Sequence, residues 1–164
     1  RRYGIDAEAC LLGVPPVDPE FRRAPAAAPT FLFVARLSRE KGADVLLRAF
    51  ARLSASAPEA ELRLAGDGGE RPRLEALAAS LGIAGRVHVL GEIEPARLDE
   101  ELACAWALVA PSRWAEPLGL IAVDALVRGV PVVASAVGGF GETVTPGEDG
   151  ILVANGDERA LAEA

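Results

Sequence analysis

The 164-residue sequence predicts an α/β domain with a doubly wound parallel sheet, because strand-like and helix-like apolar patterns alternate along the chain. Several strand-like runs are apolar on both faces, as expected of parallel strands that are covered by helices on each side. Between these runs, apolar residues recur three and four positions apart, which is the spacing of amphipathic helices. These observations together indicate a central sheet between two layers of helices.

Six strands are expected at residues 30–35, 60–65, 87–90, 107–110, 130–134 and 150–153. Two helices are indicated by apolar residues at helical spacing, the first by Leu46, Phe50 and Leu53 and the second by Leu74, Leu77, Ala78 and Leu81. A third helix is expected at 117–127, because proline is favoured in a first turn and Gly129 follows its end. A fourth helix is expected to begin near Asp157.

Charge and composition exclude several classes of protein. Lys and Arg number 17 against 24 Asp and Glu, so the net charge is −7, and such an acidic surface repels nucleic acids. Hydrophobic residues make up 51% and charged residues 25%, which argues against a disordered or fibrous chain. The longest apolar stretch, 102–110, is far shorter than the roughly 20 residues of a membrane-spanning helix. We therefore expect one globular domain without a transmembrane segment.

The ends and the cysteines give further expectations. Cys10 and Cys104 are far apart and have no CxxC spacing, so we expect buried thiols in a reducing, cytoplasmic compartment and no metal site. The sequence has no methionine and no secretion signal, which indicates a piece from the interior of a longer polypeptide. Residues 1–29 contain a Pro- and Ala-rich stretch and are expected to be a linker that enters a domain at 30–164.

Basic residues gather in the first of the loops that follow the strands. In doubly wound sheets, ligands bind beyond the carboxyl ends of the strands, here at 36–42, 66–71, 91–94, 111–119 and 135–140. Arg36, Arg39 and Lys41 precede the helix that begins near Ala43, and Lys41 is the only lysine in the sequence. Cations beside a helix amino end are unfavourable unless an anion is held between them. The cluster predicts an anion site, with solvated surface groups as the alternative.

Two acids mark the fourth loop and the helix after it. Glu116 stands just before Pro117, and Asp124 lies eight residues on, roughly 12 Å along a helix axis. Two acids at this separation could bind the two ends of one elongated ligand. The alternatives are that Glu116 complements the helix dipole and that Asp124 is exposed. Because apolar residues flank Asp124, its carboxylate needs a partner or a ligand if that face is buried.

The glycines of two other loops each allow a structural and a functional explanation. Gly66 and Gly68 resemble the start of a dinucleotide fingerprint, but Arg71 stands where its third glycine belongs, and the loop follows the second strand. A tight strand-to-helix turn is the favoured interpretation. Gly138 and Gly139 either offer backbone amides to an anion or form an ordinary turn.

Four segments, taken in order, carry a resemblance to a known family. They are VPPVDPEFR, FVARLSREKGADVLLRAF, LRLAGDGGERPRLEALAASLGIAGRVHVLGEI and PSRWAEPLGLIAVDALVRGVPVVASAVGGFGE. From about Val14 to the end, the chain resembles the carboxy-terminal, donor-binding domain of retaining glycosyltransferases of the GT-B fold, family 4. The last segment resembles the stretch that holds the family's paired acids, E-x7-E. The resemblance implies a Rossmann-like sheet and binding of a nucleoside-diphosphate sugar.

The resemblance also implies a role for each matching residue. Arg36 and Lys41 would bind the donor diphosphate and stabilise its charge as the sugar leaves. The other implied contacts are Glu116 with the sugar, the amides of Leu118, Gly119 and Leu120 with sugar or phosphate, Ile93 near the base, and the second acid, Asp124, with the ribose. The family has Glu where this chain has Asp124, so the side chain is one methylene shorter. No metal or other cofactor is implied.

The resemblance leaves the donor as UDP-, GDP- or ADP-linked. The acceptor, a sugar, lipid or other small molecule, would bind an absent amino-terminal domain, which could also associate with a membrane. We therefore expect this chain to bind a donor without transferring the sugar. The alternatives are a GT-B nucleotide-sugar epimerase, an NAD(P)-binding oxidoreductase domain and a non-catalytic Rossmann-like module.

Overall fold

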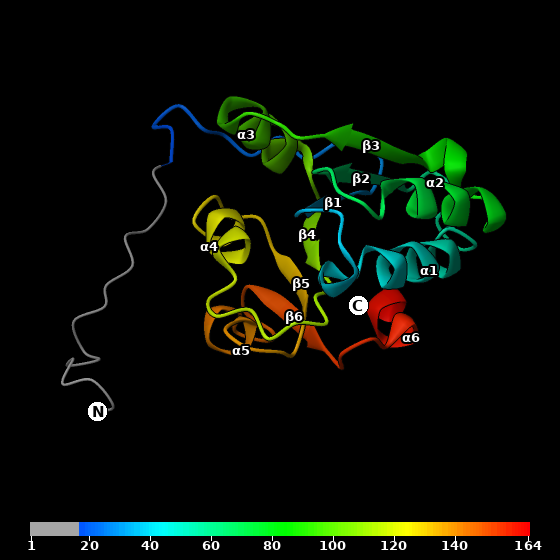
Figure 1. Cartoon of the computed structure of the whole chain (residues 1–164). Coiled ribbons are helices and arrows are strands. Elements are labelled where there is room, and N and C mark those ends of the chain that lie inside the picture. Colours follow the sequence, from blue (N-terminus) through cyan, green and yellow to red (C-terminus); the bar gives the residue numbers. More distant parts are fainter. Residues whose placement is uncertain (1–16) are drawn as a thin grey trace.

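Six parallel strands form one sheet in the computed structural model, which describes residues 17–164 (Figure 1). The strands are β1 (Thr30–Val34), β2 (Glu61–Ala65), β3 (Val87–Gly91), β4 (Ala107–Ala110), β5 (Val132–Ser135) and β6 (Gly150–Val153). Their order across the sheet is β3-β2-β1-β4-β5-β6. Each expected strand is present with its ends shifted by no more than one or two residues, so the predicted parallel sheet is confirmed.

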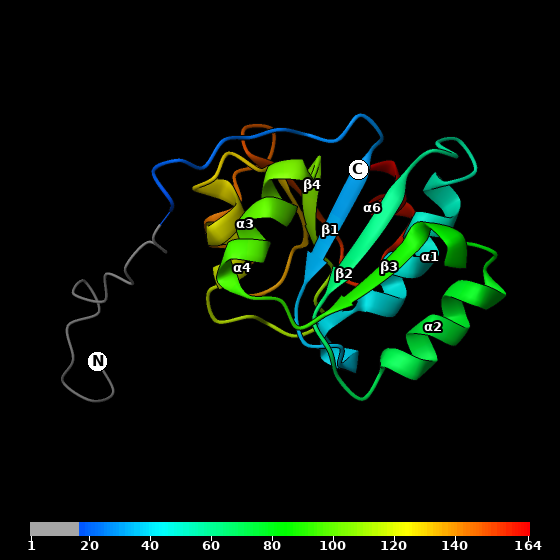
Figure 2. The same cartoon turned by 90° about the horizontal axis from the view of Figure 1, so that it is seen from above.

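Helices cover both faces of the sheet. They are α1 (Ala43–Leu53), α2 (Arg71–Ser80), α3 (Pro95–Cys104), α4 (Leu120–Leu126), α5 (Phe140–Thr143) and α6 (Glu158–Glu163), with short 3-10 helices η2 (Arg39–Lys41) and η3 (Ala84–Arg86). Figures 1 and 2 show α1, α2 and α6 on one side of the sheet and α3, α4 and α5 on the other. The sheet is therefore doubly wound, as the sequence predicts.

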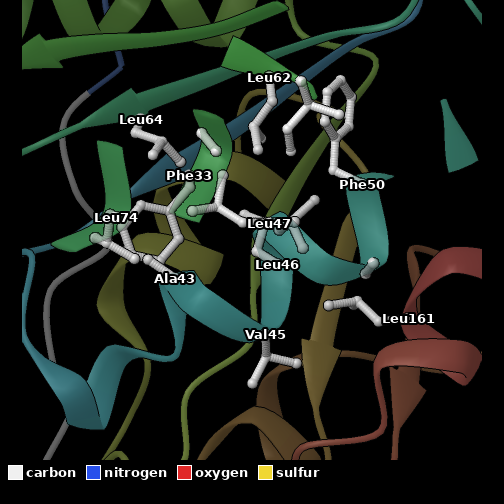
Figure 3. Packing of buried hydrophobic residues seen from close by; sticks show 14 of the residues in the cluster. Phe33, Ala43, Val45, Leu46, Leu47, Phe50, Leu62, Leu64, Leu74 and Leu161 are labelled. Atoms are coloured by element: carbon white, nitrogen blue, oxygen red, sulfur yellow. The ribbon is translucent and has the colours of Figure 1, made fainter. Parts of the chain in front are cut away.

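Each helical layer has its own apolar core against the sheet. On the first side, Leu47 and Phe50 of α1 pack with Leu62 and Leu64 of β2, and α6 contributes Leu161 (Figure 3). The second core lies between the sheet and α3, α4 and α5. Because parallel strands in this position are buried on both faces, their near-continuous apolar sequence is explained.

The start of α4 is a correction to the sequence analysis. The helix begins at Leu120, not at Pro117, because Gly119 has a left-handed backbone with φ of 70°. The carbonyl oxygens of Glu116 and Leu118 accept hydrogen bonds from the Gly139 amide and the Thr143 hydroxyl, so these carbonyls serve tertiary contacts. Glu116 therefore lies in a loop and not at a helix start, and the 12 Å separation measured along a helix axis does not apply.

Helix α3 was not expected from the sequence. The apolar stretch at 102–110 contains the end of this helix and the whole of β4. The buried residues of α3 are Leu102 and Glu101. The carboxylate of Glu101 is only 1% exposed, and it pairs with Arg63 at 2.8 Å and with Arg97 at 2.6 Å. A buried carboxylate interrupts the apolar stripe by which amphipathic helices are recognised.

The structure describes part of the linker and one of the two cysteines. Residues 17–29 contain turns and bends but no helix or strand, while residues 1–16 and Cys10 lie outside the described residues. Cys104 is partly buried and free. Among residues 17–164, no helix has the length and apolar character needed to cross a membrane.

Two glycines allow three loops at the carboxyl edge of the sheet to pack backbone against backbone. Gly42, after β1, has φ of 73°, and a Cβ there would lie 2.0 Å from the carbonyl oxygen of Pro111, which follows β4. Gly138, after β5, has φ of 53°, and its Cβ would lie 2.2 Å from the carbonyl oxygen of Glu116. Only glycine suits both the left-handed conformation and this closeness of approach.

Replacing Gly42 by alanine is expected to lower the free energy of unfolding by about 2 to 4 kcal/mol, since backbone strain and a steric clash act together. Urea denaturation measures this change. The matched control is Gly141→Ala, where a Cβ meets no atom within 4 Å and helix propensity favours alanine by at most ~1 kcal/mol. Equal stability of the two variants would contradict the proposed packing of the loops.

Candidate functional site

A cavity of about 400 Å³ opens at the carboxyl ends of β1 and β4. These adjacent strands are the point at which the strand order reverses, which is where doubly wound sheets bind ligands. Most of the wall is apolar and comes from the strand ends, the segment before α4 and Phe140 of α5. The polar side chains in the wall are Arg36, Lys41, Ser112 and Glu116.

Lys41 and Glu116 form an ion pair inside this cavity. The Lys41 Nζ lies 2.5 Å from the Glu116 Oε1, and the two side chains are 26% and 14% exposed. Lys41 belongs to η2 after β1, and Glu116 lies in the loop after β4, 75 residues further along the chain. The sheet thus brings together two residues that the sequence analysis selected separately.

The hydroxyl of Ser112 lies beside the same carboxylate. Its Oγ is 3.0 Å from the Glu116 Oε1, 3.1 Å from the carbonyl oxygen of Glu40 and 3.2 Å from that of Trp114. The residue is 3% exposed, so the hydroxyl is held within the protein. Because Glu40 directly precedes Lys41, the Ser112 hydroxyl links the segment that carries Lys41 to the carboxylate of Glu116. Sequence reasoning did not select Ser112.

Arg36 lines the cavity with a side chain that is largely exposed. Its side chain is 72% exposed, and its nearest described partner is the Glu40 carboxylate at 3.5 Å. Exposed ion pairs of this kind are weak, so the guanidinium can turn toward a bound anion at little energetic cost. Together with Lys41 it provides the cations that the sequence predicts for an anion site.

Leu118, Gly119 and Leu120 line the cavity, whereas Ile93 and Asp124 are not part of its wall. Ile93 packs against the core on the α3 and α4 side of the sheet. Asp124 is in α4, and its carboxylate pairs with Arg128 at 3.1 Å. Burial raises the pKa of Asp124, although the charge and hydrogen bond of Arg128 act in the opposite direction.

A second ion pair, called here the clamp, joins the first turn of α1 to the loop after β4, and neither of its residues lines the cavity. Arg113 donates from both terminal nitrogens to the carboxylate of Asp44, at 2.6 and 2.9 Å, and from Nη1 to the carbonyl of Arg39 at 3.1 Å. Its amide also donates to the carbonyl of Glu40. Burial alone would raise the pKa of Asp44, but the hydrogen bond and charge of Arg113 hold the pKa below its ordinary value of 3.8.

The turn at Gly66 and Gly68 has the structural role that the sequence favoured. A Cβ at Gly66 would lie 2.0 Å from the carbonyl oxygen of Ala35, and one at Gly68 would lie 2.4 Å from that of Leu37. These glycines let the loop after β2 pack on the loop after β1. Among residues 17–164, no three His, Cys, Asp or Glu side chains are grouped so as to hold a metal ion.

The sequence model of one protein family, described as glycosyl transferases group 1, matches residues 16–164. The chain belongs to this family. Membership confirms the coarse part of the resemblance drawn from the ordered loop segments. Within the family, the chain is 44% identical over 128 positions to the D-inositol 3-phosphate glycosyltransferase of Rhodococcus jostii, covering 74% of this chain and 28% of that relative.

Solved structures confirm the fold of this group 1 glycosyltransferase chain. Sucrose-phosphate synthase from Thermosynechococcus elongatus superposes with a TM-score of 0.78 at 39% identity, covering 86% of this chain and 36% of that one. Anabaena Alr3699/HepE, solved in complex with UDP-glucose, gives a TM-score of 0.77 at 30% identity, covering 84% and 38%. The chain thus spans well under half the length of these proteins.

Replacing Asp44 by asparagine is expected to lower the free energy of unfolding by about 1 kcal/mol at pH 7, the scale for a partly exposed charged hydrogen bond. Because the folded-state pKa of Asp44 lies below its unfolded value, this stabilisation is present above about pH 4 and is lost as pH falls through the folded pKa. Urea denaturation of both proteins between pH 7 and pH 3 measures the difference, with exposed Glu59→Gln as control. A difference that stays constant to pH 3 would contradict the clamp.

Proposed function

We propose that this chain is the nucleotide-sugar-binding part of a retaining glycosyltransferase of family 4. The observation that carries the proposal is the cavity at the switch point of the sheet, where Lys41 and Glu116 meet beside Arg36. Family membership supports a transferase, and the UDP-glucose complex of Alr3699/HepE supports a nucleotide-sugar donor. The retaining outcome and the family 4 assignment come from the ordered resemblance of the loops.

Lys41 and Arg36 are proposed to bind the diphosphate of the donor. Lys41 is partly buried, so its charge acts in a medium that screens less than water, and Arg36 adds a planar donor at the mouth. Negative charge grows on the diphosphate as its bond to the sugar breaks. Cations that already lie in place stabilise this charge and lower the barrier.

Glu116 is proposed to contact hydroxyl groups of the donor sugar. Its carboxylate accepts hydrogen bonds only, and Lys41 and Ser112 already lie at Oε1. The other oxygen, Oε2, has no described hydrogen bond and is available for a sugar hydroxyl. The backbone of Leu118, Gly119 and Leu120 forms the adjacent wall, where its amides are proposed to face sugar or phosphate.

The acceptor is proposed to bind a part of the longer enzyme that this chain does not contain. The proposed site supplies donor binding and stabilisation of the leaving group, and Glu116, the carboxylate that the described residues give to its wall, is already paired with Lys41 and assigned to the donor sugar. We therefore propose that the chain alone binds a nucleoside-diphosphate sugar without transferring the sugar.

Replacing Lys41 by alanine is expected to weaken binding of the preferred nucleoside diphosphate at least tenfold, about 1.4 kcal/mol. The reason is the loss of the one partly buried cation of the cavity wall. Calorimetric titration with UDP, GDP and ADP measures the affinity and identifies the base. Arg48→Ala is the matched control, because Arg48 lies in α1 and pairs with Glu158 outside the cavity.

A further titration with NAD(P)H is included. Binding of NAD(P)H alone would decide against the proposal, since that result favours a dinucleotide-binding domain. Equal loss of affinity in the Lys41 and Arg48 variants would also contradict it, because the effect would then follow net charge and not position. Loss confined to the Lys41 variant supports the donor site.

A further inference from the structure

The hydroxyl of Ser112 has three acceptors within reach and a single proton to donate. The acceptors are the Glu116 Oε1 at 3.0 Å, the carbonyl oxygen of Glu40 at 3.1 Å and that of Trp114 at 3.2 Å. Carbonyl oxygens and an ionised carboxylate accept hydrogen bonds and donate none, so Ser112 is the donor in each contact. The three acceptors therefore compete for one proton.

The two carbonyls have other donors, which leaves the carboxylate as the acceptor that gains most. The Glu40 carbonyl accepts a hydrogen bond from the Arg113 amide at 2.8 Å. The Trp114 carbonyl accepts one from the Glu116 amide, also at 2.8 Å. A charged acceptor forms a stronger hydrogen bond than a neutral one, and Glu116 Oε1 is also the nearest of the three. The Ser112 proton is therefore directed to the Glu116 carboxylate.

The same carboxylate oxygen is paired with Lys41, the cation that the proposed donor site needs. Lys41 Nζ and the Ser112 hydroxyl are the two donors that the described residues give to Glu116 Oε1. The Glu116 side chain is only 14% exposed, so losing a donor there is costly. A bound diphosphate places a second anion beside the same ammonium group. The carboxylate and the diphosphate then compete for one positive charge.

We infer that Ser112 is a positioning residue that makes Lys41 available to an anionic ligand, because its hydroxyl holds the Glu116 carboxylate while the ammonium turns toward that ligand. Without the hydroxyl, Glu116 depends on Lys41 alone, and the ion pair is harder to open. The inference rests on the proposed function. It adds to the donor site a residue that acts through Glu116 and Lys41.

The test is a cycle of substitutions at Ser112 and Glu116 that is followed by anion binding. Calorimetric titration with inorganic pyrophosphate, UDP, GDP and ADP is performed on the unaltered chain, Ser112→Ala, Glu116→Gln and the double variant. None of these ligands carries the donor sugar, so the proposed contact of Glu116 with the sugar does not enter the result.

We expect Ser112→Ala to weaken binding of the preferred ligand at least about threefold, since Lys41 is then released less readily. Glu116→Gln removes the competing charge and is expected to bind the ligand at least as tightly as the unaltered chain. In the Glu116→Gln background, Ser112→Ala is expected to leave the affinity unchanged. A role of the hydroxyl in loop packing alone would cause the same loss in both backgrounds.

Ser54→Ala is the matched control. Ser54 is 6% exposed, and its hydroxyl donates to the carbonyl of Ala51 at 3.1 Å, away from the residues that line the cavity. This variant is expected to bind as the unaltered chain does. Ser112→Cys is a second variant at the site, because a thiol occupies similar space but is a weak donor. Its affinity is expected to lie between those of the unaltered chain and Ser112→Ala, and circular dichroism of each variant establishes that folded proteins are compared.

Two results would overturn the inference alone. The first is an affinity that Ser112→Ala leaves unchanged although Lys41→Ala weakens it. The second is an equal loss from Ser112→Ala with and without the Glu116 carboxylate. Absence of binding by the unaltered chain, or binding that Lys41→Ala does not weaken, overturns the proposed function and this inference with it, so the two failures are distinguishable.

Discussion

The ion pair between Lys41 and Glu116 depends on two loops being held at a fixed separation. Bringing opposite charges into a partly buried place is costly unless their geometry is maintained. Here the backbone of Gly42 packs on Pro111, and the Asp44 to Arg113 pair joins the start of α1 to the loop after β4. The candidate site is therefore a product of loop packing as much as of the residues in its wall.

The sheet supplies the other part of this constraint. Because β1 and β4 are adjacent while their following helices go to opposite faces, the loops after them diverge and leave a cavity between them. The loop after β5 holds the loop after β4, because the Gly139 amide donates a hydrogen bond to the Glu116 carbonyl. A function that needs a cation and a carboxylate side by side can thus be placed on residues 75 positions apart.

Much of the fold can be predicted from local patterns. The strands are recognisable because burial on both faces requires apolar residues at nearly every position, and α1 because Leu46 and Phe50 repeat at helical spacing. Helix α3 was missed because a buried carboxylate, Glu101, satisfied by two arginines, interrupts its apolar stripe. The start of α4 was misplaced because Gly119 is left-handed and lies against the Phe140 ring of α5, where a Cβ would come within 2.5 Å of that ring. This closeness to a residue distant in sequence leaves no local pattern.

Some residues of the candidate site could likewise be selected from the sequence, and others could not. Arg36, Lys41 and Glu116 could be selected because the loops after parallel strands are the expected binding loops, and all three line the cavity. Ser112 could not, since its role arises from a hydroxyl that meets a carboxylate and a distant carbonyl in three dimensions. For Asp124 the sequence indicated that a buried acid needs a partner or a ligand. The structure shows that this partner is Arg128, four residues later, which the sequence analysis did not select.

A crystal structure of this chain with UDP-glucose, or with the nucleoside-diphosphate sugar that binds most tightly, tests the central claim most directly. We predict diphosphate oxygens within hydrogen-bonding distance of the Lys41 Nζ and the Arg36 guanidinium, and a sugar hydroxyl within hydrogen-bonding distance of the Glu116 carboxylate. A diphosphate bound instead at the Gly66 to Gly68 turn, with the Lys41 to Glu116 cavity empty, would contradict the account.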